Sequence, residues 1–393
     1  MKFKNKFILL FICLMLFPFP FEWYVYQFIL INVVLIPIVA FNKNDAIQFV
    51  PKIDIYFSLF IVLSFMSVLW AINLTLVWGH AFGWLLFFLW FLVFRSYILR
   101  KDFDFISKLL FYFFVGCSIY IISVVILKHI ITESPWHQYF GNNSNNISVL
   151  ASMSIPFVFY GVKNGKMEFC IKAFSIIAIL YCVTVASSIS VLAAVLFVIP
   201  ILIILEYFSI SVMKKYLILG FYSIMSISLF RPLVHLFKLD ELASFQSRLL
   251  LTEVSLNSFL SNPFVGVGLG NWEIIAFSNG IPLDEFNFKT SILTIENHNL
   301  FTNILVELGL LGCMFYFIPI AIILISSLSN FKGLRALEKS AFFSIIIYLY
   351  TSLFYKSNHI DDFFFSKPEF LFFTCLSILS VHFLKMNESI YTK

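Results

Sequence analysis

Residues 76–94 read LVWGHAFGWLLFFLWFLVF, an apolar run long enough to cross the hydrocarbon core of a bilayer as one helix. Similar runs recur along the chain. Hydrophobic residues make up 61% of the 393 residues, charged residues only 12%, and phenylalanine alone contributes 52. Because a water-soluble fold could not bury this much apolar surface, the composition predicts an integral membrane protein.

We predict an all-α, polytopic fold with about twelve transmembrane helices in a single membrane domain, residues 1–393. Basic residues precede the first run, but Pro18, Pro20 and Glu22 follow where a signal peptide would need small residues. The first span is therefore expected to stay uncleaved. The expected spans cover residues 7–21, 24–41, 55–72, 76–94, 109–127, 147–162, 173–187, 189–205, 216–236, 299–327, 341–355 and 368–384.

Lysine and arginine indicate how this topology is oriented, because they concentrate in cytoplasmic loops. With a cytoplasmic N-terminus, 19 of the 26 fall on the cytoplasmic side and 7 on the opposite side. Both termini are therefore expected in the cytoplasm, and the long loop over 237–298 outside it. Within this loop, residues 239–260 have the apolar spacing of an amphipathic helix along the membrane surface. The net charge of +5 thus reflects topology and does not indicate a nucleic-acid partner.

Polar residues gather on the expected outer side beyond what topology requires, which predicts a site there. The densest stretch, 248–312, contains Arg248 and His298. A guanidinium can bind a lipid diphosphate through paired hydrogen bonds, although Arg248 could instead reach lipid headgroups. The His298 imidazole can accept a proton from a hydroxyl near neutral pH, with Asn297 and Asn299 orienting it; alternatively, it only hydrogen-bonds the loop at a helix start.

The glycine-rich segment of this stretch, Gly266 to Gly270, lacks the preceding strand and the Lys-Ser/Thr ending of a nucleotide loop, so we predict a backbone turn. Glu307 is expected to make a buried structural contact, with Asn303 one helical turn before it. The six cysteines lie in apolar segments without a Cys-x-x-Cys pair. This pattern argues against disulfides and against a thiolate metal site.

Together these segments resemble the O-antigen ligase and O-antigen polymerase superfamily of bacterial envelope enzymes. The resemblance rests on Arg248, NPFVGVGLGNW (262–272), His298-Asn299 and ELGLLG (307–312), with weaker similarity in SVLWAIN (67–73) and YFGNNSNNIS (139–148). It implies a helical membrane glycosyltransferase in the bacterial cytoplasmic membrane, with its active site facing the periplasm. Many members carry a second arginine between the seventh and eighth spans, where this chain reads ASSIS (186–190). In this chain, Arg231 or another cation on the outer side would take the place of that second arginine, or the lipid-linked donor substrate is held in a different way.

The resemblance implies that Arg248 holds the diphosphate of an undecaprenyl-diphosphate-linked glycan and that His298 positions or deprotonates an acceptor hydroxyl. Asn297, Asn299, Arg231 and Asn146 are the further candidates for substrate binding. No cofactor or metal is needed in this scheme.

The leading hypothesis is a polymerase of O-antigen or capsular repeat units, whose acceptor is a second lipid-linked glycan. The close alternative is a ligase that joins finished polysaccharide to lipid A core in lipopolysaccharide. A transporter of lipid-linked sugars is a more distant alternative, because the polar groups gather at one surface and no internal repeat is found. The partners are then the lipid-linked donor, the glycan or lipid A core acceptor, membrane lipids and a chain-length regulator protein.

Overall fold

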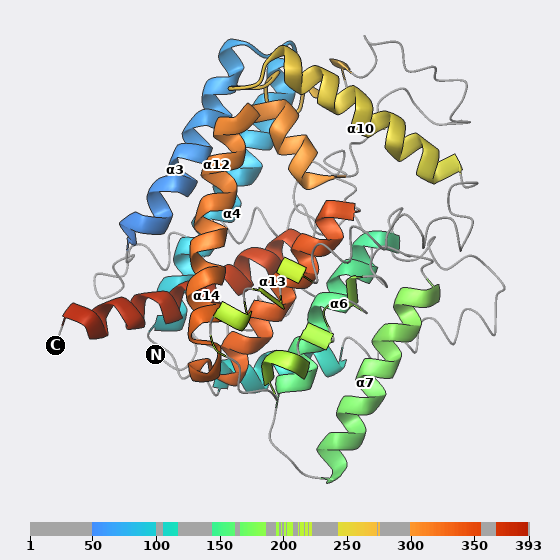
Figure 1. Cartoon of the computed structure of the whole chain (residues 1–393), viewed down its shortest axis with the longest axis vertical. Coiled ribbons are helices and arrows are strands. Elements are labelled where there is room, and N and C mark those ends of the chain that lie inside the picture. The colour runs from blue at the N-terminus through green and yellow to red at the C-terminus, as the bar shows by residue number, and fades with distance from the viewer. Residues whose placement is uncertain are drawn as a thin grey trace.

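The chain is a helical bundle in a computed structural model, and the structure describes part of it (Figure 1). The described residues are 49–99, 105–116, 144–161, 166–185, 194–195, 198, 200–201, 203–206, 211, 213–215, 217–218, 220–221, 243–272, 274–275, 299–354 and 367–391. Within these ranges the regular elements are all helices. The first two expected spans lie outside the described residues.

The α-helices are α3 (Pro51–Met66), α4 (Leu74–Leu99), α6 (Ser144–Tyr160), α7 (Lys166–Val185), α10 (Ala243–Ser261), α12 (Leu300–Ser329), α13 (Ala336–Phe354) and α14 (Lys367–Tyr391). Two short 3-10 helices, η1 (Ser67–Leu69) and η5 (Phe331–Gly333), follow α3 and α12. Three segments in the described ranges are long and apolar enough to cross a membrane: Pro51–Leu69, Leu74–Leu99 and Leu300–Ser329. These findings agree with an all-α membrane protein, while the full set of about twelve helices stays a prediction.

The core lies between α3, α4, α12 and α14, and α13 packs against both α14 and α6. Its centre is aromatic: Tyr316 of α12 contacts Phe60 of α3 at 5.3 Å and Trp84 of α4 at 5.4 Å between ring centroids. Phe373 of α14 stacks on Phe87 of α4 at 5.2 Å. These helices are apolar all round because one face meets lipid and the other meets this core.

A buried ion pair joins the start of α3 to the end of α4. Arg95 donates to both carboxylate oxygens of Asp54, at 2.8 and 2.6 Å, and both side chains are fully buried. The backbone N–H of Val50 also donates to Asp54, at 2.6 Å. Two charges at such depth are tolerated because each is neutralised and hydrogen-bonded by the other.

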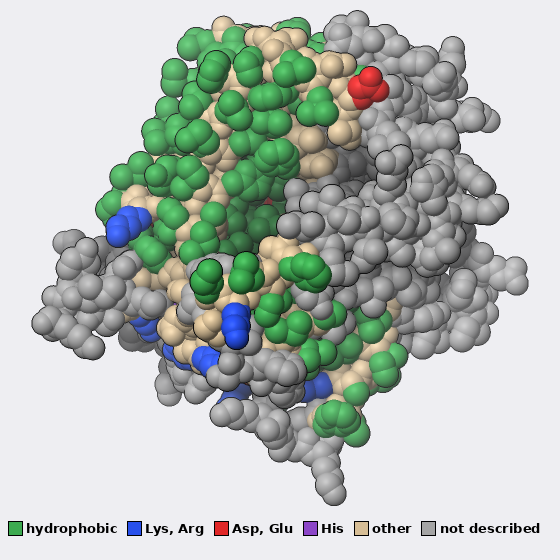
Figure 2. All heavy atoms as spheres, in the orientation of Figure 1, with side chains coloured by type: hydrophobic (Ala, Val, Ile, Leu, Met, Phe, Trp, Pro, Cys, Tyr) green, Lys and Arg blue, Asp and Glu red, His purple; other side chains and the backbone are tan. Residues whose placement is uncertain are grey.

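Basic side chains gather at the end of the bundle where α12 ends and α13 begins. Figure 2 shows them over the lower part of the visible face, with hydrophobic side chains above. Lys339 is ion-paired with Glu206 at 2.8 Å, and the Arg335 backbone and side chain donate to Glu338 at 2.8 and 2.9 Å. Burial raises the pKa of Glu338, but hydrogen bonds from His382 and Arg335 outweigh it and lower the pKa to about 2.

Candidate functional site

The opposite end of the bundle carries an irregular backbone segment, residues 262–272, which we call the glycine turn. The φ angles of Gly266, Gly268 and Gly270 are positive, at 66°, 101° and 72°. Residues with a side chain rarely adopt such angles, whereas glycine does so readily. The expected backbone turn is thus confirmed. It follows α10 directly and lies at the top of the view in Figure 1.

The glycine turn packs into a break in α12. The expected continuous span over 299–327 is interrupted at Gly309, whose φ of 65° and ψ of −164° are not helical. Four backbone hydrogen bonds, which we call the clasp, join the turn to this break: Val267 to Val306 (2.9 Å), Gly268 to Glu307 (2.9 Å), Leu310 to Pro263 (2.9 Å) and Leu311 to Phe264 (3.2 Å), each from N–H to carbonyl oxygen.

The clasp explains why the break in α12 is stable. In an unbroken helix the N–H groups of residues 310 and 311 would donate to the carbonyls of residues 306 and 307. Here the glycine turn supplies partners for all four groups, so none of them stays unsatisfied. A Cβ at Gly266 would overlap the backbone of Val306 and Glu307, and a Cβ at Gly309 would overlap that of Phe264.

The clasp also places Glu307 in the segment of α12 that precedes the break. Its side chain is buried, with 5% exposed, as the sequence suggested for a structural contact. Its backbone carbonyl accepts from Gly268. The carboxylate therefore belongs to the short first segment of α12, near the glycine turn.

The turn is tied to the segment between α3 and α4 by polar side chains about 200 residues away in sequence. Leu269 N–H donates to Ser67 Oγ at 3.2 Å. Asn271 is fully buried, accepts from the N–H of Asn73 at 2.6 Å and donates to the carbonyl of Leu269 at 2.9 Å. Ser67 and Asn73 bound the SVLWAIN segment, so two of the motifs that carry the family resemblance meet in space.

Asn299 is the one sequence-predicted site residue whose side chain the structure describes. It is the N-cap of α12: its side-chain oxygen accepts from the N–H groups of Phe301 and Thr302 at 2.9 and 3.2 Å. The cap satisfies backbone donors that a helix start leaves open. It also fixes the backbone directly after His298.

The other candidates are described only in part. Arg248 lies in α10 and Asn146 in α6, but their side chains are outside the described part of the chain. Arg231, Asn297 and His298 lie outside the described residues altogether. Their roles stay predictions.

Two residues that the sequence reading did not single out also lie at the glycine turn. Asn271 is one, and its position directly after the third glycine is the signal that could have identified it. The other is His80 of α4, whose imidazole would lie 2.9 Å from a Cβ at Gly270. Within the described part of the chain, its Nδ1 is buried and makes no hydrogen bond.

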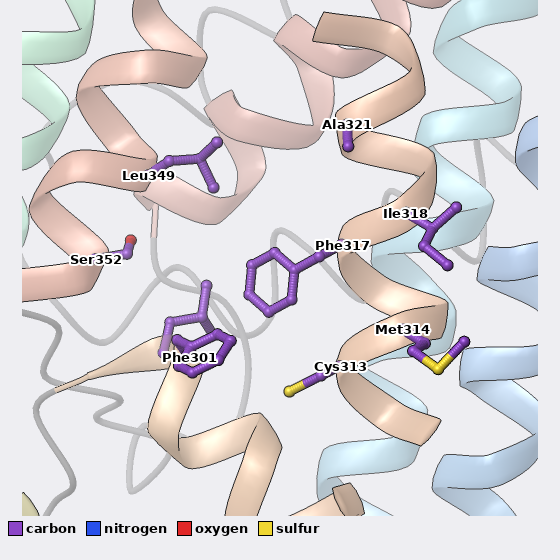
Figure 3. Close-up of a pocket in the computed structure, with 9 residues that line it drawn as sticks. Phe301, Cys313, Met314, Phe317, Ile318, Ala321, Leu349 and Ser352 are labelled. Atoms are coloured by element: carbon purple, nitrogen blue, oxygen red, sulfur yellow. The ribbon is translucent and has the colours of Figure 1, made fainter. Parts of the chain in front are cut away.

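An apolar cavity of about 490 Å³ lies beside the start of α12 (Figure 3). Phe301, Phe317 and Leu349 point toward one another across it. Its lining comes from both segments of α12 and from α13: Leu300, Phe301, Cys313, Met314, Phe317, Ile318, Ala321, Leu349 and Ser352. Two of the lining residues, Leu300 and Phe301, directly follow Asn299 in the sequence. The apolar lining is suited to a hydrocarbon chain.

Comparison with known families gives the decisive observation. Residues 173–317 match the model of a family described as O-Antigen ligase. The resemblance to the O-antigen ligase and polymerase superfamily is confirmed. The match supports a glycosyl-transferring membrane enzyme of the O-antigen ligase or polymerase type, which acts on a lipid-linked glycan and an acceptor. A search of curated proteins found no match.

Proposed function

We propose that the chain is a polymerase of O-antigen or capsular repeat units. The observation that supports transfer of a lipid-linked glycan, which a polymerase and a ligase share, is the family match, because the matched residues 173–317 contain the entire stretch 248–312 with the glycine turn at its centre. The apolar cavity next to the start of α12 supports a lipid-linked donor. The gathering of basic side chains at the other end of the bundle supports a periplasmic site, since lysine and arginine concentrate on the cytoplasmic side.

In the proposed reaction, a hydroxyl oxygen of one lipid-linked glycan attacks the anomeric carbon of the donor's reducing-end sugar. The bond between that carbon and the diphosphate oxygen breaks, and undecaprenyl diphosphate leaves with the electron pair. His298 takes the hydroxyl proton, and Arg248 binds the diphosphate as its negative charge grows. Because Asn299 uses its side-chain oxygen as a helix cap, we assign it the role of positioning His298. Arg231 is the proposed second cation, and Asn297 and Asn146 are proposed glycan contacts.

Ligation to lipid A core is the second candidate, and the family description as O-Antigen ligase favours it. A deletion strain separates the two. A polymerase deletion leaves single repeats attached to core and no long polymer, whereas accumulation of long polymer unattached to core would overturn the polymerase proposal in favour of a ligase.

Purified protein in lipid vesicles tests whether the activity is transfer or transport. We expect polymer to form from lipid-linked repeats that are already exposed on the leaflet facing the site. In the same assay, Arg248→Ala and His298→Ala should each abolish transfer while protein abundance stays normal. Full activity in both variants would refute the site assignment, and passage of lipid-linked repeats across the bilayer without polymer would indicate a transporter.

A further inference from the structure

A small apolar core, separate from the main one, joins α10, the glycine turn and the first segment of α12. Its members are Leu251 and Val254 of α10, Val267 and Trp272 of the glycine turn, and Val306 of α12. The Val306 carbonyl is also one end of the clasp. The helix that carries Arg248 and the helix that follows His298 are therefore packed on a shared centre.

Trp272 connects the glycine turn to α10 through a directed hydrogen bond. Its side chain is 1% exposed, and its indole N–H donates to Ser255 Oγ at 2.8 Å. The Ser255 hydroxyl in turn donates to the carbonyl of Leu251 at 2.7 Å. This chain of two bonds fixes the serine rotamer and the indole plane, and so fixes the orientation of α10 against the turn.

Arg248 lies on the same helix as Ser255, which accepts the indole hydrogen bond of Trp272. Arg248 precedes Ser255 by seven residues, and Asn299, directly after His298, precedes Val306 by seven. Seven residues make about two helical turns and about 10 Å, and they return to nearly the same helix face. In Figure 1, α10 and the first turns of α12 leave the glycine turn toward the same side. The packed centre therefore holds both α10, which carries position 248, and the first segment of α12.

We propose that Trp272 and Ser255 are positioning residues, which set the separation between the diphosphate-binding arginine and the histidine that activates the acceptor. This inference rests on the proposed function. A rotation of α10 by about 5° around Ser255 moves position 248 by about 1 Å, and a misplacement of that size can cost about 100-fold in rate. Neither Trp272 nor Ser255 has to touch substrate for this effect.

The test is a double-mutant cycle in vesicles, with kcat and KM for lipid-linked repeats measured beside thermal stability. Trp272→Phe keeps most of the apolar volume but loses the indole N–H, and Ser255→Ala removes its acceptor. The matched control is Trp90→Phe, because Trp90 donates a buried indole hydrogen bond of the same kind, to Thr374 Oγ1 at 3.1 Å, between α4 and α14.

We expect Trp272→Phe and Ser255→Ala each to lower kcat about 10- to 100-fold, with KM changed by less than about twofold. The double variant should be no slower than the slower single variant, because both break one bond. Trp90→Phe should lower the melting temperature but leave kcat unchanged. If Trp272→Phe does not accumulate, Ser255→Ala alone carries the test.

Two outcomes would overturn the inference: wild-type kcat in both single variants, or a kcat loss in Trp90→Phe as large as theirs. Arg248→Ala and His298→Ala measured in parallel keep this result apart from the proposed function. If they abolish transfer while the Trp272 and Ser255 variants stay fully active, only the positioning role fails. If they leave transfer intact, the site assignment itself fails.

Discussion

Replacing Gly309 by alanine should uncouple the glycine turn from α12. The φ of 65° and ψ of −164° at this position are accessible essentially to glycine alone, and forcing another residue into them costs about 1–3 kcal/mol. The added Cβ would also overlap the Phe264 carbonyl, which accepts from Leu311, beside the bond from Leu310 to Pro263. Losing these two bonds costs about 0.5–1.5 kcal/mol each, so the total is about 2–6 kcal/mol.

The assay is thermal unfolding of the detergent-purified protein. Samples are heated to a series of temperatures, and size-exclusion chromatography measures the fraction that remains folded in each. At about 2 °C per kcal/mol for a long chain, the midpoint should fall by about 4–12 °C. Gly83→Ala is the control, because it lies within α4 and a Cβ there would meet no atom within 4 Å. Alanine is the better helix former, so this midpoint should stay or rise. A Gly309→Ala midpoint equal to that of the wild type would refute the clasp.

Three further predictions follow from the described contacts. Asp54→Ala should cost about 3–5 kcal/mol and sharply reduce protein abundance, because it leaves the buried Arg95 charge uncompensated. Asn299→Ala should lower the free energy of unfolding by about 1 kcal/mol and slow transfer, because the helix cap is lost. Asn299→Asp can still cap the helix, so both the stability and the transfer rate should return to wild-type values. If aspartate fails to restore transfer, the amide itself contacts substrate. Glu338 has a lowered pKa, so its stabilisation is complete above about pH 4.5 and is lost as pH falls toward about 2. The melting-point gap between wild type and Glu338→Gln should therefore narrow from pH 6 to pH 3.

The sequence was a good guide wherever a local pattern decides the structure. Apolar runs of sufficient length predicted helices, and alternating glycines predicted a backbone turn, because both depend on residues next to one another. The tenth span was expected to begin at residue 299, and Asn299 caps the helix that begins there. None of these features needs knowledge of a distant partner.

The sequence could not show features that depend on long-range pairing. ELGLLG reads as continuous helix, since a single helical glycine costs only about 1 kcal/mol, and only the hydrogen bonds from the glycine turn make the break stable. The pairing of Asn271 with Asn73 spans 198 positions and leaves no local pattern. Arg95 was counted as a topological charge, but its burial against Asp54 gives it a structural role as well.

The composition helps to explain why backbone groups hold this site together. With only 12% charged residues, the chain has few side chains from which to build a polar framework at the membrane surface. The glycine turn instead exposes its own N–H and carbonyl groups, and glycine lets them approach α12 closely enough to bond. Side chains such as Trp272 and Asn271 then orient this backbone unit against α10 and the main bundle. Arg248 and His298 would be left free for substrate, so substitutions at the glycines should disturb geometry, and substitutions at these two residues should disturb chemistry.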